Sequence, residues 1–112
     1  MFGSPRIPEI LAPDVSDDAF LLDVREPDEW NAGHAPQAHH VPMMELVARI
    51  DEVPSDRDVV VVCRVGSRSA QVVNYLLANG WSRASNLSGG MFAWQAAGRE
   101  MVSGTDRPAQ VL

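Results

Sequence analysis

The feature that most limits the fold of this 112-residue chain is a run of four consecutive valines, Val59–Val62. Valine is β-branched and favours extended backbone, and a run without alternating polar residues indicates a strand that is covered on both faces. The run ends at the chain's only cysteine, Cys63, which opens a short polar loop that contains Gly66. An amphipathic segment, residues 70–77, follows the loop. The sequence therefore predicts a buried central strand that leads through a loop to a helix.

The rest of the chain alternates between strand-like and helix-like patterns. Short apolar runs that suit strands cover residues 19–24, 38–41 and 84–87. Helical spacing, or a proline followed by acids, predicts helices over residues 27–31, 43–50 and 91–97. Residues 9–11 suit a short edge strand or a helical turn. Because strands and helices that alternate with short connections form a mostly parallel sheet with helices on both faces, we expect an α/β fold.

The length and composition of the chain fit one globular domain. A chain of 112 residues, 46% hydrophobic and 21% charged, is long enough for one core and too short for two. We predict a single domain over residues 1–102 and a mobile tail over residues 103–112, which lack periodicity. Residues 1–10 lack the apolar region of a secretory signal, and no apolar segment reaches the length of a transmembrane helix. We therefore expect a soluble cytoplasmic protein that does not bind a membrane.

Charge and cysteine content argue against several classes of function. A net charge of −6 disfavours a nucleic-acid-binding surface, because that role usually needs a basic patch. One cysteine cannot form an internal disulfide or supply a four-sulfur site for zinc or an iron–sulfur cluster. His39 and His40 are neighbours, so on a strand they point to opposite faces and do not chelate one metal. We expect no metal and no cofactor.

Cys63 stands in a loop that suits an activated thiol. A lone cysteine is most often a small buried hydrophobe. Here, however, the next six residues include one glycine, two serines and two arginines, none of which a core cysteine needs. The unpaired N–H groups and the positive dipole end at a helix start favour a thiolate, and Arg64 and Arg68 add positive charge. We interpret Cys63 as a nucleophile and both arginines as donors to the oxygens of an anionic substrate.

Two further motifs accompany the loop. The first is Leu22-Asp23-Val24-Arg25-Glu26 with Glu29-Trp30 and Gly33-His34-Ala35-Pro36. The loop itself is Cys63-Arg64-Val65-Gly66-Ser67-Arg68-Ser69, and the last motif is Leu87-Ser88-Gly89-Gly90 with Trp94. In this order they resemble the D-V-R…E-[aromatic]…G-H-x-P, C-R-x-G-x-R-S and L-x-G-G-x-x-x-W signatures of single-domain rhodaneses, a family of sulfurtransferases. They span residues 20–98, which is most of the chain.

The resemblance implies a rhodanese-like sheet of about five strands, flanked by helices, and sulfur transfer through a persulfide. Cys63 would attack the sulfane sulfur of a small anionic donor such as thiosulfate, and sulfite would leave. Cyanide or a thiol, including a protein thiol, would then take the sulfur in the second half of a double displacement. We expect the anionic sulfur to be held by backbone N–H groups of the loop residues Val65, Gly66, Ser67, Arg68 and Ser69.

Three other side chains of the first motif are candidates for supporting roles. Asp23 and Arg25 leave the end of a predicted central strand, where α/β sheets bind ligands, so a catalytic role is one interpretation. We favour the alternative that they form a structural ion pair between loops. For His34 we likewise favour a hydrogen bond to a neighbouring loop over a role as general base.

Two other classes of function remain open at this stage. A cysteine-dependent phosphatase on a related fold would place five residues between its cysteine and arginine, whereas four separate Cys63 from Arg68. The shorter loop suits a single sulfur atom. A non-catalytic interaction module is the other alternative, and rhodanese-like domains of that kind lack the cysteine that this chain retains.

Overall fold

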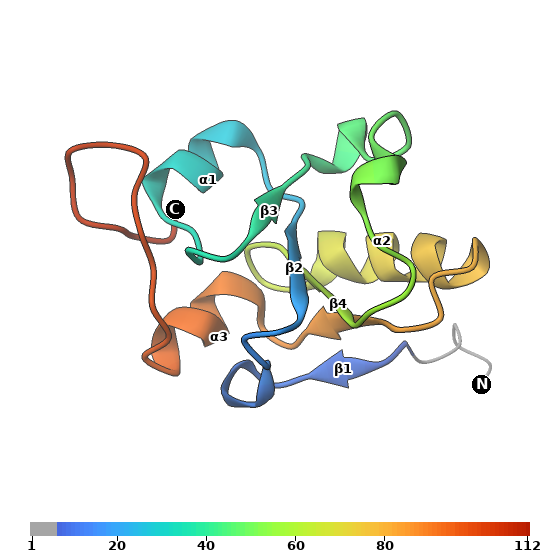
Figure 1. The fold of residues 1–112 in the computed structure, drawn as a ribbon. Helices are drawn as coiled ribbons and strands as arrows, with labels where there is room; N and C mark the ends of the chain where they lie inside the picture. The colour runs from blue at the N-terminus through green and yellow to red at the C-terminus, as the bar shows by residue number, and fades with distance from the viewer. Residues whose placement is uncertain (1–6) are drawn as a thin grey trace.

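The centre of the protein is a parallel sheet in which the chain's valine run is the middle strand (Figure 1). The computed structural model describes residues 7–112, so residues 1–6 of the predicted domain lie outside the described residues. The five strands, in the spatial order β1-β5-β4-β2-β3, are β1 (Glu9–Ile10), β2 (Phe20–Asp23), β3 (His39–His40), β4 (Val59–Val62) and β5 (Ala84–Leu87). The helices are α1 (Pro27–Ala32), α2 (Ser67–Ala78) and α3 (Gly90–Ala96). The predicted α/β fold with a parallel five-stranded sheet is confirmed.

Strand β4 is covered on both faces, as its composition predicts. Val59 and Val61 pack into the apolar cluster that includes residues of α2, while Val60 and Val62 pack into the cluster that includes residues of α3. All four side chains are buried. Helices therefore lie on both faces of the sheet (Figure 1), and each strand delivers its following loop to the same edge.

Helix α2 begins three residues earlier than its apolar pattern indicates. The pattern predicts a helix from residue 70, whereas the helix runs over Ser67–Ala78. Gly66 precedes it with φ at 112°, a left-handed conformation that residues with a Cβ rarely adopt. The glycine thus turns the chain sharply enough for the helix to start inside the polar loop. As a result, the serines and the second arginine of the loop belong to the first helical turn.

The helix expected over residues 43–50 is wrong. This stretch contains two separate 3₁₀ turns, Met43–Glu45 and Ile50–Glu52. The apolar residues that suggested a helical face do not share one environment, because Leu46 is buried whereas Met44 is 88% exposed. Arg49 also donates to the carbonyl oxygen of His40 (3.1 Å) and holds the chain back toward β3. The segment is therefore a tight connection along the sheet edge.

The last ten residues pass beside α1 (Figure 1). Gly104 N donates to the carbonyl oxygen of Asn31, and Gln110 N donates to that of Ala32, both at 2.9 Å. The mobility expected for residues 103–112 stays a prediction. Within residues 7–112, no helix is both long and apolar enough to span a membrane.

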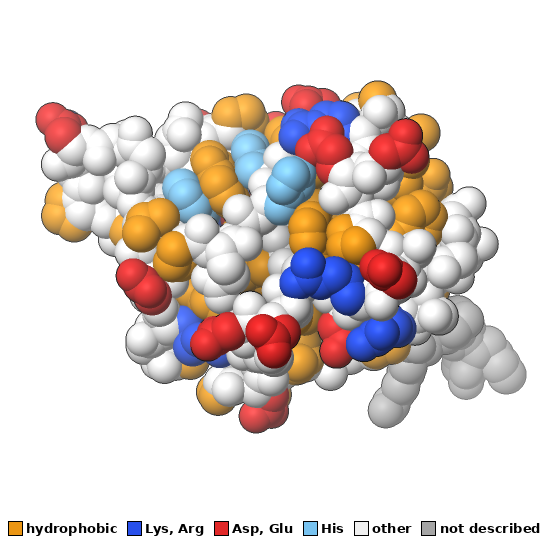
Figure 2. Space-filling view, viewed as in Figure 1, with side chains coloured by type: hydrophobic (Ala, Val, Ile, Leu, Met, Phe, Trp, Pro, Cys, Tyr) orange, Lys and Arg blue, Asp and Glu red, His pale blue; other side chains and the backbone are white. Residues whose placement is uncertain are grey.

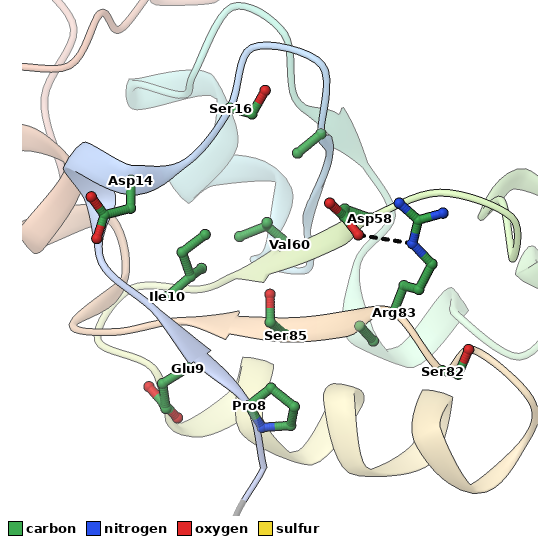
Figure 3. Close-up of a pocket in the computed structure, with 12 residues that line it drawn as sticks. Pro8, Glu9, Ile10, Asp14, Ser16, Asp58, Val60, Ser82, Arg83 and Ser85 are labelled. Carbon is green, nitrogen blue, oxygen red and sulfur yellow. Dashed lines mark hydrogen bonds and ion pairs between the residues drawn. The ribbon is translucent and has the colours of Figure 1, made fainter.

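A surface groove of about 370 Å³ lies at the amino ends of the strands (Figure 3). Ile10, Val60 and Ser85 line its floor, and the ion pair between Asp58 and Arg83 stands at one side of it. Parallel α/β sheets bind ligands at the carboxyl ends of their strands, which is the opposite edge. The groove is thus distant from the loop that carries the cysteine.

Candidate active site

The Cys63 sulfur lies directly after β4, at the carboxyl edge of the sheet, and faces the start of α2. Sγ accepts hydrogen bonds from Gly66 N (3.1 Å), Ser69 N (3.4 Å) and the Ser69 hydroxyl (3.2 Å). The residue is fully buried. Two backbone N–H groups and one hydroxyl of the loop thus point at one sulfur atom, whereas a role of all residues 65–69 in holding a substrate sulfur stays a prediction.

These hydrogen bonds change the acidity of the thiol. Burial raises the pKa of Cys63, but the Ser69 hydroxyl and the N–H groups of Ser69, Gly66 and Val65 outweigh it, so that the pKa lies below its ordinary value. A lowered pKa increases the thiolate fraction at neutral pH, and the thiolate is the nucleophile. The geometry thus supports the interpretation of Cys63 as a reactive thiol.

The loop is held from behind by the start of α3. Met91 N donates to the carbonyl oxygen of Cys63 (2.9 Å), and Phe92 N donates to that of Arg64 (3.4 Å). Gly90 makes this approach possible: a Cβ there would lie 2.5 Å from each of these two carbonyl oxygens, and its φ is +60°. The second glycine of the last motif is therefore required by the cysteine loop.

Arg68 lies at the site but is already paired. Its guanidinium donates to both carboxylate oxygens of Glu29, at 2.8 and 2.9 Å. This contact lowers the pKa of Glu29 and raises that of Arg68. Arg64 is more exposed; its Nε donates to a main-chain oxygen of Leu112 (2.5 Å), and its guanidinium lies over the Phe92 ring. Both arginines of the loop thus have partners within the chain.

Asp23 and Arg25 form the buried ion pair that we favoured from the sequence. Both side chains are fully buried, and Arg25 donates to the Asp23 carboxylate at 2.8 and 2.9 Å. Arg25 also donates to the carbonyl oxygens of Glu29 (3.3 Å), within α1, and of Gly33 (2.8 Å), which directly follows it. Among residues 7–112, no hydrogen bond joins either side chain to Cys63. The pair fixes α1, and with it Glu29, beside the cysteine loop.

Comparison with known proteins agrees with this arrangement. A family model described as a rhodanese-like domain matches residues 8–97. The chain belongs to the rhodanese-like domain family. It is 42% identical, over 79% of its length and 82% of the relative's, to a protein of Allochromatium vinosum named sulfurtransferase. A putative sulfurtransferase of Bacillus subtilis, YtwF, is 35% identical over 73% of this chain and 79% of that protein.

A solved structure shows the same fold. The crystal structure of a rhodanese-related protein from Thermoplasma volcanium has a TM-score of 0.78 and 30% sequence identity, and the match covers 85% of this chain and 97% of that one. The sequence-based resemblance to the rhodaneses is therefore confirmed at the level of family and fold.

The histidines of this rhodanese-like domain have structural contacts. His34 Nδ1 lies 2.7 Å from the carbonyl oxygen of Trp30, and His40 Nε2 lies 2.7 Å from that of Arg25. Both imidazole rings stack on the Trp30 indole. The histidine side chains, pale blue in Figure 2, lie on the upper part of the face shown there. His39 instead contacts Glu52 (2.7 Å), so the two adjacent histidines point to opposite faces, as predicted.

Sequence reasoning missed a polar network behind the Cys63 loop of this rhodanese-like domain. The Ser69 hydroxyl lies 2.5 Å from Asn86 Oδ1, and Asn86 Nδ2 donates to the carbonyl oxygen of Gly66 and to Glu9 Oε2, each at 3.1 Å. Asn86 is a buried amide in the otherwise mostly apolar strand β5. That polar residue just before the last motif was the available signal, because buried amides need hydrogen-bond partners.

Proposed function

We propose that this rhodanese-like domain is a sulfurtransferase that carries a sulfane sulfur as a Cys63 persulfide. The observation that carries the proposal is the buried Cys63 sulfur, which faces two N–H groups and a hydroxyl at the start of α2. Donors fixed around one sulfur stabilise an anion without any rearrangement when the charge forms. The sulfurtransferase names of relatives at 42% and 35% identity support the same assignment.

In the first half-reaction, the Cys63 thiolate attacks the outer sulfur of an anionic donor such as thiosulfate. The S–S bond to Cys63 forms as the donor's S–S bond breaks, and sulfite leaves with the bonding electron pair. The enzyme then carries the persulfide anion, so the total charge is conserved. The N–H groups of Gly66 and Ser69 donate to the sulfur. We expect the N–H groups of residues 65–69 to hold the transferred sulfur, and Arg64 and Arg68 to bind the donor's oxygens, Arg68 once it is released from Glu29.

In the second half-reaction, a thiophilic acceptor attacks the terminal sulfur of the persulfide. Cyanide would leave as thiocyanate, and a low-molecular-weight or protein thiol would leave as its persulfide; either product regenerates the Cys63 thiolate. A buried thiolate in a ring of donors is a good leaving group because its pKa is lowered. The cycle needs no cofactor and suits a reducing compartment such as the cytoplasm, where a lone thiol stays reduced.

Intact-protein mass spectrometry after incubation with thiosulfate tests the proposal. We expect the mass to increase by one sulfur atom, the increase to disappear on treatment with a thiol reductant, and the variant Cys63→Ser to show no increase. A protein that gains no sulfur and instead hydrolyses an aryl phosphate would be a phosphatase, and the proposal would be wrong. A protein with neither activity that captures a stoichiometric partner would be an interaction module.

A further inference from the structure

The positive charge of the second loop arginine is neutralised within the chain. Arg68 and Glu29 form a two-point ion pair, with N–O distances of 2.8 and 2.9 Å. The side chains are 33% and 14% exposed, respectively, so the Glu29 carboxylate is largely withdrawn from water. Glu29 Oε1 also accepts a hydrogen bond from Glu26 N (2.9 Å), which fixes the carboxylate at the start of α1. Glu29 is thus positioned before any substrate arrives.

The two other arginines near the loop differ from each other. Arg25 is buried against the Asp23 carboxylate, whereas Arg64 is exposed and contacts a main-chain oxygen of Leu112 and the ring of Phe92, neither of which is a carboxylate side chain. Of these three arginines, only Arg64 therefore offers a positive charge that no acidic side chain neutralises. That charge can balance one negative charge on the donor, and a second negative charge finds no further counter-charge while Glu29 holds Arg68.

We propose that Glu29 is a specificity-determining residue, which holds Arg68 and thereby favours sulfane-sulfur donors with one negative charge over the dianion thiosulfate. The inference rests on the proposed sulfur transfer, whose donor class it narrows. A thiosulfate dianion must displace Glu29 from Arg68 or bind without that arginine. A monoanion has one negative charge fewer, so it loses less binding energy when it binds without Arg68. Removal of the Glu29 charge should release Arg68 toward the donor.

Thiosulfate and methanethiosulfonate are a matched pair of donors for the test. In methanethiosulfonate a methyl group replaces one charged oxygen, so the two ions differ by one negative charge and little in size. With thiosulfate, the Cys63 thiolate takes the outer sulfur and sulfite leaves with the bonding electrons. With methanethiosulfonate, the same S–S bond forms and methanesulfinate leaves. Charge balances in both reactions, and neither needs an oxidant or reductant.

The decisive variant is Glu29→Gln, with Glu26→Gln as its control. Glutamine keeps an oxygen for the hydrogen bond from Glu26 N but removes the charge that holds Arg68. We expect kcat/KM for thiosulfate, divided by that for methanethiosulfonate, to increase about fivefold at low ionic strength, since one charge near a freed cation is worth roughly this in water. Glu26 is exposed and has the same charge three residues earlier, but it makes no hydrogen bond to Arg68. Glu26→Gln should change the ratio by less than twofold.

Two further variants keep the test decisive. Adding Arg68→Gln to Glu29→Gln should cancel the increase in the ratio. If Glu29→Gln does not fold, as judged by circular dichroism, Arg68→Lys replaces it. Lysine retains the charge but cannot bind both Glu29 oxygens in the same plane, so the ratio should also increase.

The outcomes separate the inference from the proposed function. A wild-type protein that takes sulfur from neither donor refutes sulfur transfer itself. A wild-type protein that takes sulfur from both donors, with a ratio that Glu29→Gln leaves unchanged or that Glu26→Gln raises equally, refutes the role of Glu29 alone. A lower ratio in Glu29→Gln would refute it as well, because the ion pair would then assist the dianion.

Discussion

Replacement of Ser69 by alanine should make the Cys63 thiol less acidic. The Ser69 hydroxyl is one of the hydrogen-bond donors to Sγ, and its loss removes stabilisation from the thiolate but little from the neutral thiol. The thiol pKa must therefore increase. The N–H donors, from Val65, Gly66 and Ser69, belong to the backbone and are retained in the variant.

The structure limits the size of the change. A hydrogen bond to a charged group contributes about 1.5–3 kcal/mol. The Ser69 hydroxyl has one proton, and it lies 2.5 Å from Asn86 Oδ1 but 3.2 Å from Cys63 Sγ, so the two acceptors compete for it. We therefore use the lower limit, and about 1.5 kcal/mol corresponds to an increase of about one pKa unit.

The thiolate's ultraviolet absorbance, followed as the pH is raised, gives the pKa directly. We expect the titration midpoint of Ser69→Ala to lie about one pH unit above that of the wild type. The midpoint of the control variant Ser67→Ala should equal that of the wild type. Ser67 is an exposed residue in the same helical turn, and it makes no hydrogen bond to Sγ in the described part of the chain. An unchanged or lower midpoint in Ser69→Ala would refute the assignment of the hydroxyl as a donor to the thiolate.

Three further predictions concern stability. Arg25→Met leaves the Asp23 charge buried without its counter-charge, although the backbone N–H of residue 25 still donates to it, and should lower the free energy of unfolding in urea by about 3–5 kcal/mol; a loss under 1 kcal/mol would contradict a buried pair. Gly90→Ala places a Cβ 2.5 Å from two carbonyl oxygens, whereas Gly98→Ala meets no atom within 4 Å, so thermal melting should fall clearly more in the first variant. Because the Cys63 pKa is lowered by folding, folding releases a proton between the folded and unfolded pKa values. The free energy of unfolding of the wild type, minus that of Cys63→Ser, should therefore rise with pH up to about the unfolded thiol pKa near 8.5, and this difference should be lost as the pH falls through the folded pKa. Urea titrations in which the two proteins show the same pH dependence across this window would contradict the lowered pKa.

The parts of the fold that follow from local sequence were predictable. Four adjacent valines admit few environments other than a strand that is covered on both faces, and β4 has that environment. The loop and helix after it follow from one glycine and an amphipathic pattern. Alternation of such units then determines a parallel sheet, because each crossover must return to the same edge.

The wrong prediction of a helix over residues 43–50 has a physical cause of its own. Apolar residues at helical spacing predicted a helix over residues 43–50, but spacing does not reveal which side chains become buried. Met44 is exposed while Leu46 is buried, so the segment has no apolar face to dock. Without such docking a short helix gains little over local turns, which explains the 3₁₀ geometry found there.

The partners of the site residues could not be read from sequence at all. Arg68 and Glu29 are 39 positions apart, and Asn86 and Glu9 are 77 apart. Each pair is joined only because the sheet order places β1 beside β5 and fixes α1 beside the start of α2. From sequence, both loop arginines appear free to bind an anion; in the fold each has a partner.

Thiol acidity and the preference for the charge of the donor depend on different groups at this site, whereas unpaired arginines beside the sulfur would affect both. Thiol acidity depends chiefly on N–H groups and one hydroxyl that donate to the sulfur. The proposed preference for sulfur donors of lower charge depends instead on Glu29 and Arg68, which bind each other and do not hydrogen-bond to the sulfur. Substitutions at Ser69 and Glu29 should therefore act independently, so that their effects on log kcat/KM for thiosulfate add in the double variant. A marked departure from additivity would mean that the ion pair acts on the thiol itself, and donor charge could then not be selected without altering the reactivity of Cys63.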